Sequence, residues 1–254
     1  MISKKIHLFT NELKIINSLK FFFIIKQIFT EDRHLNSKLK KLKYSTFLIK
    51  THKDLYKKNL LSADIGVSYG FGIIFKKKFL KRYKNGIWNI HPGSLPNYRG
   101  RHPITAAFLN DEKKIGVSVH IVNEKIDRGH LLAKSFVRRN YSDDELSIKK
   151  KIFRISLKIL KKAIQNFNKK KFLKLSKGKY YKPYFNGIEI KDSKKIDYKY
   201  IFNAAKAQKS FNGIVVNGRR YYNAFFYSSK NYNKKNIEIV VCKNNKKLIL
   251  VNKK

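Results

Sequence analysis

The sequence predicts an α/β protein with a doubly wound, mostly parallel, Rossmann-like sheet and a small β-rich C-terminal appendage. Segments with the periodicity of strands and helices alternate up to about residue 180, as they do when crossover helices join parallel strands. The run at 21–30 is apolar almost throughout, which suits a strand covered by helices on both faces. We therefore expect a main domain at residues 1–180 and a small β-rich domain at residues 181–254.

Each element of the first half rests on a local pattern. The expected strands are 5–10, 21–30, 45–49, 64–70 and 86–91. Asn11 is a suitable N-cap for a helix that continues to about Lys20. The spacing of apolar residues predicts another helix at 51–61, whereas residues 31–44 have the composition of a polar, basic connection.

The second half continues the alternation and then changes character. The expected elements are a helix at 103–110, strands at 116–122 and 131–137, and a helix at 197–208. Between them, Ser142 and Glu145 form a capping box for a long helix that keeps its apolar period to about Asn168. Beyond residue 208 we expect two hairpins, one turning at Asn217-Gly218 and one around Asn244-Asn245.

The chain is strongly basic. It has 59 Lys and Arg residues against 16 Asp and Glu, a formal net charge of +43, and such a field attracts nucleic acid and other polyanions. Lys, Ile, Asn, Phe and Tyr are all frequent, however, and they share A/T-rich codons. Biased genome composition therefore explains the charge as well as RNA binding does. The hydrophobic fraction of 43% indicates a folded protein.

Several classes of protein are not expected. The single cysteine, Cys242, allows no internal disulfide framework and fits a reducing cytoplasm. The longest apolar run, 19–29, contains lysines and is too short to cross a bilayer, and no secretory signal is evident. The histidines do not have the spacing of metal ligands. The sequence has no glycine-rich phosphate-binding loop, so a nucleotide cofactor is not expected. We expect a cytoplasmic protein without a metal.

The most informative stretch runs from Trp88 to Pro103. Asn89 and His91 are two residues apart at the end of a predicted strand, so their side chains point to the same face. An amide that donates at any pH and an imidazole suit polarising a carbonyl and moving a proton. Asp127, on an expected loop, could orient the imidazole. Taken singly, these residues are more often a turn cap, a surface histidine and a turn.

Three segments resemble the folate-dependent formyltransferases. They are Asn-x-His-Pro-Gly-Ser-Leu-Pro-x-Tyr-Arg-Gly at 89–100, Gly-Val-Ser-Val-His-Ile-Val at 116–122, and Ile-Asp-Arg-Gly-His-Leu-Leu-Ala at 126–133. That family includes methionyl-tRNA formyltransferase, glycinamide ribonucleotide formyltransferase and the amino-sugar formyltransferases. The resemblance is clear over about residues 64–137. It implies the formyltransferase fold and the transfer of a formyl group from 10-formyltetrahydrofolate to a primary amine.

The resemblance also implies roles for individual residues. Asn89, His91 and Asp127 match the catalytic residues in order and spacing, with Asp127 lying 36 residues after His91. Folate would be held by Phe71, Gly72, Ile73, Gly93, Ser94, Leu95 and Pro96. The family's loop reads Ser-Leu-Leu-Pro, so Gly93 and Ser94 depart from it, and the consequence for folate affinity stays open.

The formyl acceptor is also left open. The charge of +43 and the basic stretch 38–43 favour the phosphate backbone of methionyl-tRNA, and hence a role in translation initiation. The small C-terminal appendage and the run 101–103 are closer to members that act on amino-sugar nucleotides. Methionyl-tRNA is narrowly preferred, and a non-catalytic RNA-binding relative is a third alternative. His102 is expected to cap a helix at the surface, and His120 to be buried and hydrogen-bonded.

Overall fold

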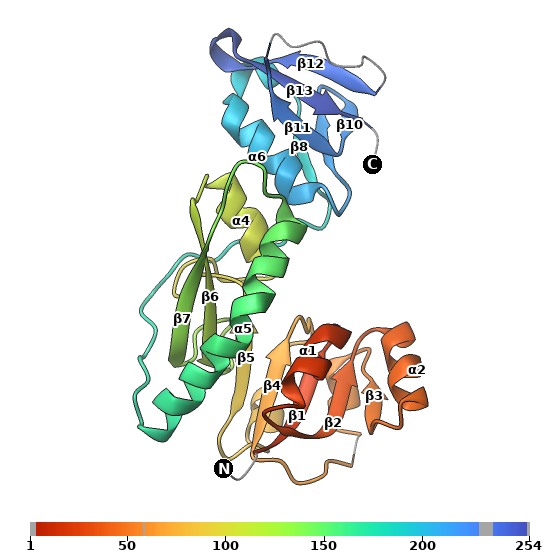
Figure 1. Cartoon of the computed structure of the whole chain (residues 1–254), viewed down its shortest axis with the longest axis vertical. Coiled ribbons are helices and arrows are strands. Elements are labelled where there is room, and N and C mark those ends of the chain that lie inside the picture. Colours follow the sequence, from red (N-terminus) through yellow and green to blue (C-terminus); the bar gives the residue numbers. More distant parts are fainter. Residues whose placement is uncertain (1–3, 58, 229–235, 253–254) are drawn as a thin grey trace. The chain divides into compact units, whose positions relative to one another are not determined.

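The computed structural model describes residues 4–57, 59–228 and 236–252. Seven strands form one sheet in the order β3-β2-β1-β4-β5-β6-β7 (Figure 1). Their bounds are β1 (Lys5–Thr10), β2 (Ile24–Thr30), β3 (Thr46–Leu48), β4 (Ile65–Tyr69), β5 (Ile87–His91), β6 (Lys114–Ile121) and β7 (Leu131–Arg138). Neighbouring strands from β3 to β5 are parallel, and β6 is antiparallel to β5. The predicted mostly parallel, doubly wound sheet is confirmed.

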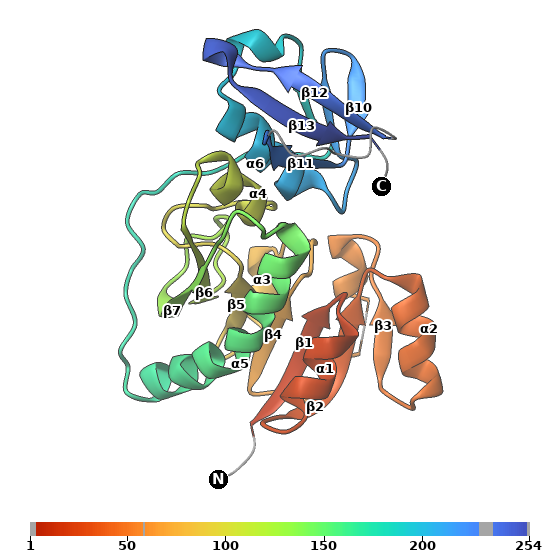
Figure 2. The same cartoon turned by 45° about the horizontal axis from the view of Figure 1, so that its top comes forward.

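The helices alternate with these strands as expected for the fold class. They are α1 (Leu13–Leu19), α2 (Arg33–Lys41), α3 (Lys77–Leu80), α4 (Pro103–Leu109), α5 (Glu145–Asn168) and α6 (Tyr198–Gln208), with short 3-10 helices η1 (His52–Leu55), η2 (Ser193–Lys195) and η3 (Lys243–Asn245). Helix α1 packs against β1, and α2 packs against β3 (Figure 2). Among the described residues, no helix is both long and apolar enough to cross a membrane.

Aromatic side chains fill the core beside β1 and β2. Phe9 is fully buried, and its ring stacks on Phe29 with centroids 4.8 Å apart. The rings of Phe75 and Phe79 meet Phe9 edge to face. Such contacts exclude water from the middle of the sheet and make its strand ends a rigid support for a site.

Backbone proximity divides the chain into two compact units. The first comprises Met1–Arg99, Gly116–Ser135 and Arg154–Lys179. The second comprises Gly100–Ile115, Phe136–Phe153 and Tyr180–Lys254. The expected domain boundary near residue 180 stays a prediction, because compactness does not say which part of the chain folds independently.

The second unit contains two small sheets, in the orders β10-β9-β8 and β11-β13-β12. Their strands are β8 (Ile188–Ile190), β9 (Ile214–Val216), β10 (Arg219–Tyr221), β11 (Asn223–Phe226), β12 (Ile237–Val241) and β13 (Lys247–Val251). Asn217 and Gly218 turn the hairpin β9–β10 at φ angles of 49° and 80°. Asn244 and Asn245, also at positive φ, lie between the antiparallel strands β12 and β13. Both predicted hairpins and the β-rich character are confirmed.

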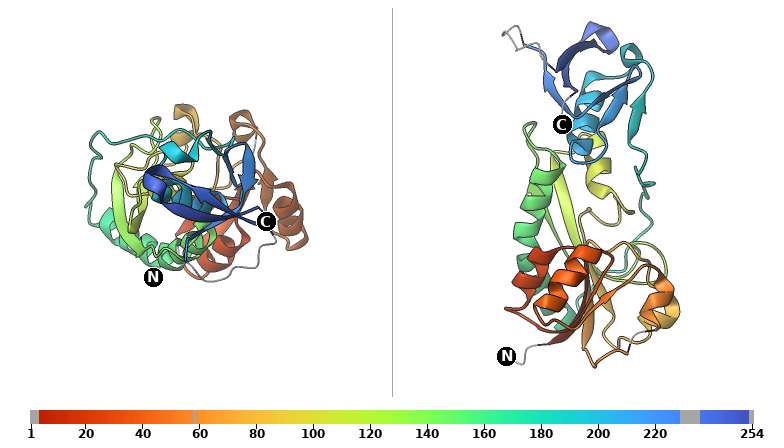
Figure 3. Two further views of the ribbon diagram at one scale, coloured as in Figure 1. Left: turned by 90° about the horizontal axis from the view of Figure 1, so that it is seen from above. Right: turned by 90° about the vertical axis from the view of Figure 1, so that its right-hand side faces the viewer.

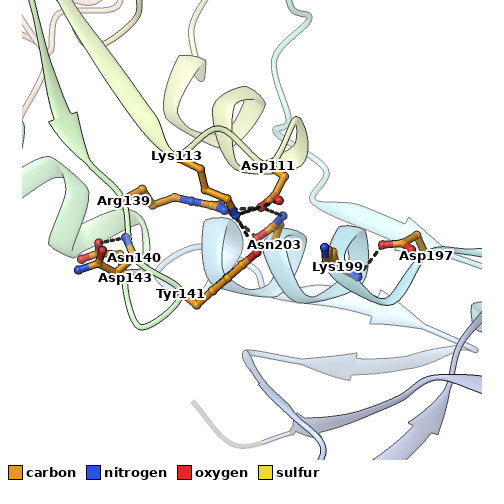
Figure 4. A network of polar contacts seen from close by, with 9 residues as sticks. All are labelled: Asp111, Lys113, Arg139, Asn140, Tyr141, Asp143, Asp197, Lys199 and Asn203. Atoms are coloured by element: carbon orange, nitrogen blue, oxygen red, sulfur yellow. Dashed lines mark hydrogen bonds and ion pairs between the residues drawn. The ribbon is translucent and has the colours of Figure 1, made fainter.

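Helix α6 supplies the apolar centre of this unit. It lies against the strands of the small sheets, β11 among them (Figure 3). The ring of Phe202 stacks on Phe226 of β11, with centroids 4.2 Å apart. A polar network lies beside it (Figure 4). Arg139, 4% exposed, donates to Asp111 at 2.5 Å and to the Asn203 amide oxygen at 3.1 Å. The network ties the turn after α4 and the end of β7 to α6 within the second unit.

Three local predictions were wrong near the N-terminus. Residues 31–44 contain helix α2, which begins after Asp32, whose side chain accepts from the Leu35 N–H at 2.9 Å. Asn11 does not cap α1, because its amide bonds Glu31 and the Gly70 carbonyl instead. The strand predicted from residue 21 begins at Ile24.

Two predicted helix features also differ. The helix expected at 51–61 is the short η1, since Gln27 of β2 bonds the Asn59 carbonyl and the Leu61 N–H and holds that segment away from a helix. The long helix α5 begins at Glu145, and Asp144 takes the place expected of Ser142, with its carboxylate accepting from the Ser147 N–H at 2.9 Å.

Candidate active site

Asn89 and His91 lie on β5, between β4 and the antiparallel strand β6. The register pairs Asn89 with His120 and His91 with Ser118. Residues two apart on a strand share one face, and cross-strand partners lie side by side. Four polar side chains therefore gather on one face of the β5–β6 ladder, and three of them are at most 3% exposed: His91, Ser118 and His120.

Asp127 reaches this face from the loop between β6 and β7. Its Oδ1 lies 3.7 Å from Nδ1 of His91 and 3.4 Å from Nε2 of His120. The Asp127 side chain is 10% exposed. The loop is pressed against β6 at Gly129, where a Cβ would fall 1.5 Å from the Ile121 carbonyl oxygen. The structure thus brings His91 and Asp127 together, as the spacing of the motifs suggested.

The geometry of His91 defines where its proton sits. Nε2 lies 2.8 Å from the carbonyl oxygen of Tyr98, and a carbonyl can only accept. The proton of the neutral ring is therefore on Nε2, and Nδ1 faces Asp127 with a lone pair. Burial lowers the pKa of His91 below its ordinary value, against the opposing effect of Asp127. A neutral imidazole beside a carboxylate is suited to taking up a proton and stabilising the resulting charge.

The loop 93–96 is fixed by side chains of β6 and β7. The Ser118 hydroxyl donates to the Gly93 carbonyl at 2.7 Å and accepts from the Leu95 N–H at 3.1 Å. Lys134 donates to the Leu95 carbonyl at 2.9 Å. Side chains of β6 and β7 thus bond backbone groups of the turn and hold the loop in one conformation.

Gly93, one of the two departures from the family's loop, has a steric explanation. A Cβ at this position would lie 2.5 Å from Nε2 of His91 and 2.7 Å from the Tyr98 carbonyl oxygen. Both atoms belong to the hydrogen bond that orients the His91 ring. In this chain the glycine allows the loop to close onto the imidazole.

The segment after β4 lies at the carboxyl ends of three parallel strands. The Gly72 N–H donates to Glu31 at 2.5 Å, and the Asn11 amide bonds Glu31 and Gly70. Phe71 and Ile73 are half-buried and pack against the aromatic core. This edge is where ligands bind in open α/β sheets. The residues 71–73, which were predicted to hold folate, therefore lie at the edge of the sheet that ligands can reach. The side chains of Glu31 and Asn11 hold this segment, and the sequence analysis did not assign them to the site.

The sequence also left other neighbours of the site unassigned. Ser118, Lys134 and His120 take positions that depend on the pairing of β5, β6 and β7, which no local pattern encodes. His120 is buried and hydrogen-bonded as predicted, but its contacts are Asn89 and Asp127. His102 precedes α4 without capping it, and its Nδ1 accepts from the Tyr184 N–H at 2.9 Å. Within the described ranges, no group of three metal-ligating side chains is arranged to hold an ion.

The chain is similar to known proteins in sequence and in structure. Residues 39–164 match the model of the family described as formyl transferase. A methionyl-tRNA formyltransferase of Pseudothermotoga lettingae is 36% identical over 106 residues, which are 42% of this chain and 35% of that protein. The chain thus spans about a third of the length of the curated relatives it matches.

Solved structures match over nearly the whole chain. WlaRD, a sugar 3N-formyl transferase solved with dTDP and 5-N-formyl-THF, has a TM-score of 0.72 at 20% identity, and the match covers 99% of this chain and 98% of that one. An N-formyltransferase from Helicobacter canadensis, in complex with folinic acid and dTDP-3-aminofucose, has a TM-score of 0.71 at 18% identity over 99% and 100% of the two chains. At these identities the likeness shows the fold.

Proposed function

Because residues 39–164 make the chain a member of the formyl transferase family, we propose that it transfers a formyl group from 10-formyltetrahydrofolate to a primary amine. The observation that carries the proposal is the buried contact of His91 with Asp127 at 3.7 Å, beside Asn89 on the same strand face. These are the groups that an acyl transfer to an amine requires, in an environment largely closed to water.

The proposed reaction divides the work among the three residues. The amine nitrogen attacks the formyl carbon, and an N–H of Asn89 donates to the oxygen that becomes negative in the tetrahedral intermediate. Neutral His91 takes the proton that the amine loses, and Asp127 stabilises the imidazolium. The bond between the formyl carbon and N10 of the folate then breaks, and the proton passes to N10. No other reactant is consumed.

The formyl donor is proposed to lie along residues 71–73 and the loop 93–96. The half-buried Phe71 and Ile73 offer apolar surface to a pterin ring, and the backbone of the loop is already held by Ser118 and Lys134. Little of the loop's ordering entropy would then have to be lost on binding. Structural relatives solved with 5-N-formyl-THF and folinic acid support this choice of donor.

For the acceptor, the extent of the structural match favours an amino-sugar nucleotide. The structures of WlaRD and of the Helicobacter canadensis N-formyltransferase are matched over 98% and 100% of their length, whereas the sequence of the methionyl-tRNA formyltransferase is matched over 35% of its length. Methionyl-tRNA is the second candidate, because curated relatives that are 36% and 33% identical are named for it and the charge of +43 would attract RNA.

One assay tests both levels of the proposal. Purified protein receives 10-formyltetrahydrofolate with methionyl-tRNA or, separately, with a panel of nucleotide-linked amino sugars. We expect formylated sugar, and we expect His91→Ala to lower turnover by orders of magnitude while the protein stays folded. Product from methionyl-tRNA alone would reverse the order of the acceptors. Absence of product with every acceptor would contradict formyl transfer and favour a non-catalytic RNA-binding relative.

A charge-matched pair of variants separates the acceptors further. Lys38, Lys40 and Lys41 are exposed on α2, and replacing them with Ala should weaken use of methionyl-tRNA and flatten its salt dependence if α2 binds RNA. The exposed Lys169, Lys170 and Lys171 provide a control that removes the same charge elsewhere. Turnover of an amino-sugar nucleotide should be unchanged by either triple replacement.

A further inference from the structure

His120 occupies the position opposite Asn89 in the β5–β6 ladder. It is 1% exposed, and both of its ring nitrogens have a defined neighbour. Nδ1 lies 3.2 Å from the carbonyl oxygen of Ile121, and Nε2 lies 3.4 Å from the amide nitrogen of Asn89. A buried imidazole in contact with Asn89 can therefore affect the orientation of that proposed catalytic amide.

These two contacts favour one tautomer of the neutral ring. The Ile121 carbonyl can only accept a hydrogen bond, so Nδ1 of His120 carries the proton in this tautomer. In the neutral ring, Nε2 is then an acceptor, and the Asn89 amide nitrogen donates to it. This is the opposite tautomer to that of His91, whose Nε2 donates to the Tyr98 carbonyl.

The consequence falls on the orientation of the Asn89 amide. An Asn amide turned by a half rotation about its last bond exchanges an acceptor oxygen for a donor nitrogen with little change of shape. We propose that His120 is a positioning residue, whose Nε2 accepts one N–H of Asn89 and thereby leaves the second N–H to donate to the formyl oxygen. The inference rests on the proposed formyl transfer, and it assigns His120 a task in that reaction.

Asp127 limits this arrangement to the neutral ring. Its Oδ1 lies 3.4 Å from the same Nε2, so a protonated His120 would turn its Nε2–H toward the carboxylate. Asn89 would then lose its acceptor, and its amide oxygen would be drawn toward the ring. The same carboxylate lies 3.7 Å from Nδ1 of His91, so one Asp is placed between two rings, and each ring has a different function.

The tautomer can be measured on the unmodified protein. Nitrogen-15 chemical shifts of labelled histidine distinguish Nδ1–H from Nε2–H rings, and the His120 signals are those missing from the spectrum of His120→Gln. We expect Nδ1–H for His120 and Nε2–H for His91 at neutral pH. An Nε2–H tautomer at His120 would overturn the proposal, because that ring could not accept from Asn89.

Kinetics test the task itself, with the acceptor that the wild type uses among methionyl-tRNA and the nucleotide-linked amino sugars. His120→Leu removes the acceptor and should lower kcat about tenfold or more, up to the roughly 10²–10³-fold that a lost oxyanion donor costs. KM for 10-formyltetrahydrofolate should stay nearly constant. His120→Gln offers an oxygen to Asn89 and an N–H to Asp127, and should restore most of kcat.

The controls separate positioning from folding and from the proposed function. His34→Leu makes the same exchange at an exposed position of α2 and should change nothing. If His120→Leu does not fold, His120→Asn replaces it, because its amide ends short of the Nε2 position. Wild-type kcat in the Leu variant, or equal losses in the Leu and Gln variants, would overturn the proposal. If the wild type formylates no acceptor, the proposed function fails and the tautomer measurement alone decides the inference.

Discussion

Deleting the hydroxyl of Ser118 should loosen the loop 93–96 by a calculable amount. Ser118 is fully buried, and its hydroxyl joins the Gly93 carbonyl and the Leu95 N–H at 2.7 and 3.1 Å. A buried group left unpaired costs about 1–3 kcal/mol. The two backbone groups also bond each other at 3.2 Å, so the total loss in Ser118→Ala should stay near about 1–3 kcal/mol rather than twice that.

Thermal unfolding is the assay for this prediction. At about 2–4 °C per kcal/mol for a chain of this size, Tm should fall by about 2–12 °C. Ser18→Ala is the matched control, since the Ser18 hydroxyl bonds a carbonyl within α1 and is partly exposed. KM for 10-formyltetrahydrofolate should rise while kcat changes less. A Tm equal to that of Ser18→Ala would refute the view that this hydroxyl holds the loop.

Three further predictions concern other parts of the molecule. Burial lowers the pKa of His7 from 6.5 to about 4. Between these two pH values the imidazole is protonated in the unfolded chain and neutral in the folded chain. Urea unfolding should therefore show about 3 kcal/mol of stability lost as pH falls from 6.5 to 4, and His7→Gln should remove that pH dependence. Asp111→Asn leaves the buried Arg139 charge less compensated and should cost about 2–4 kcal/mol in the free energy of unfolding, whereas losing the exposed Lys113 partner should cost less than about 1 kcal/mol. Gly93→Ala should lower both Tm and turnover by overpacking, at about 1–3 kcal/mol, and unchanged values would show that the loop can move aside.

The parts of the fold that the sequence predicted correctly are those encoded over short distances. Asn217-Gly218 turns a hairpin because both residues accept positive φ, and this preference needs no partner elsewhere in the chain. Helix α2 was missed because its buried face contains only two apolar residues, Leu35 and Leu39, and the rest of the helix is polar or basic. Two apolar residues are too few to show a helical period. The helix predicted at 51–61 was wrong because Gln27, far away in sequence, bonds residues 59 and 61. Tertiary hydrogen bonds overrode local propensity there.

The candidate site divides in the same way. Asn89, His91 and Asp127 were found because they lie within motifs that resemble those of a known family. His120, Ser118 and Lys134 entered the site through the register of β5 and β6 and the placement of β7, which depends on pairing between segments that are separated by the connections 92–113 and 122–130. Their side chains alternate with apolar residues in the sequence, and that pattern gives the face of a strand but not its neighbour.

The pairing of Asn89 with His120 and of His91 with Ser118 also bears on how such a protein can change over generations. Strand side chains alternate with a period of two, so one residue gained or lost inside β6 would turn Ser118 and His120 away from His91 and Asn89 at once. The connection from residue 92 to 113 does not have to keep this alternation, although its first residues are held by Ser118, Lys134 and His91. The eight positions of β6 must therefore be inherited without insertion or deletion.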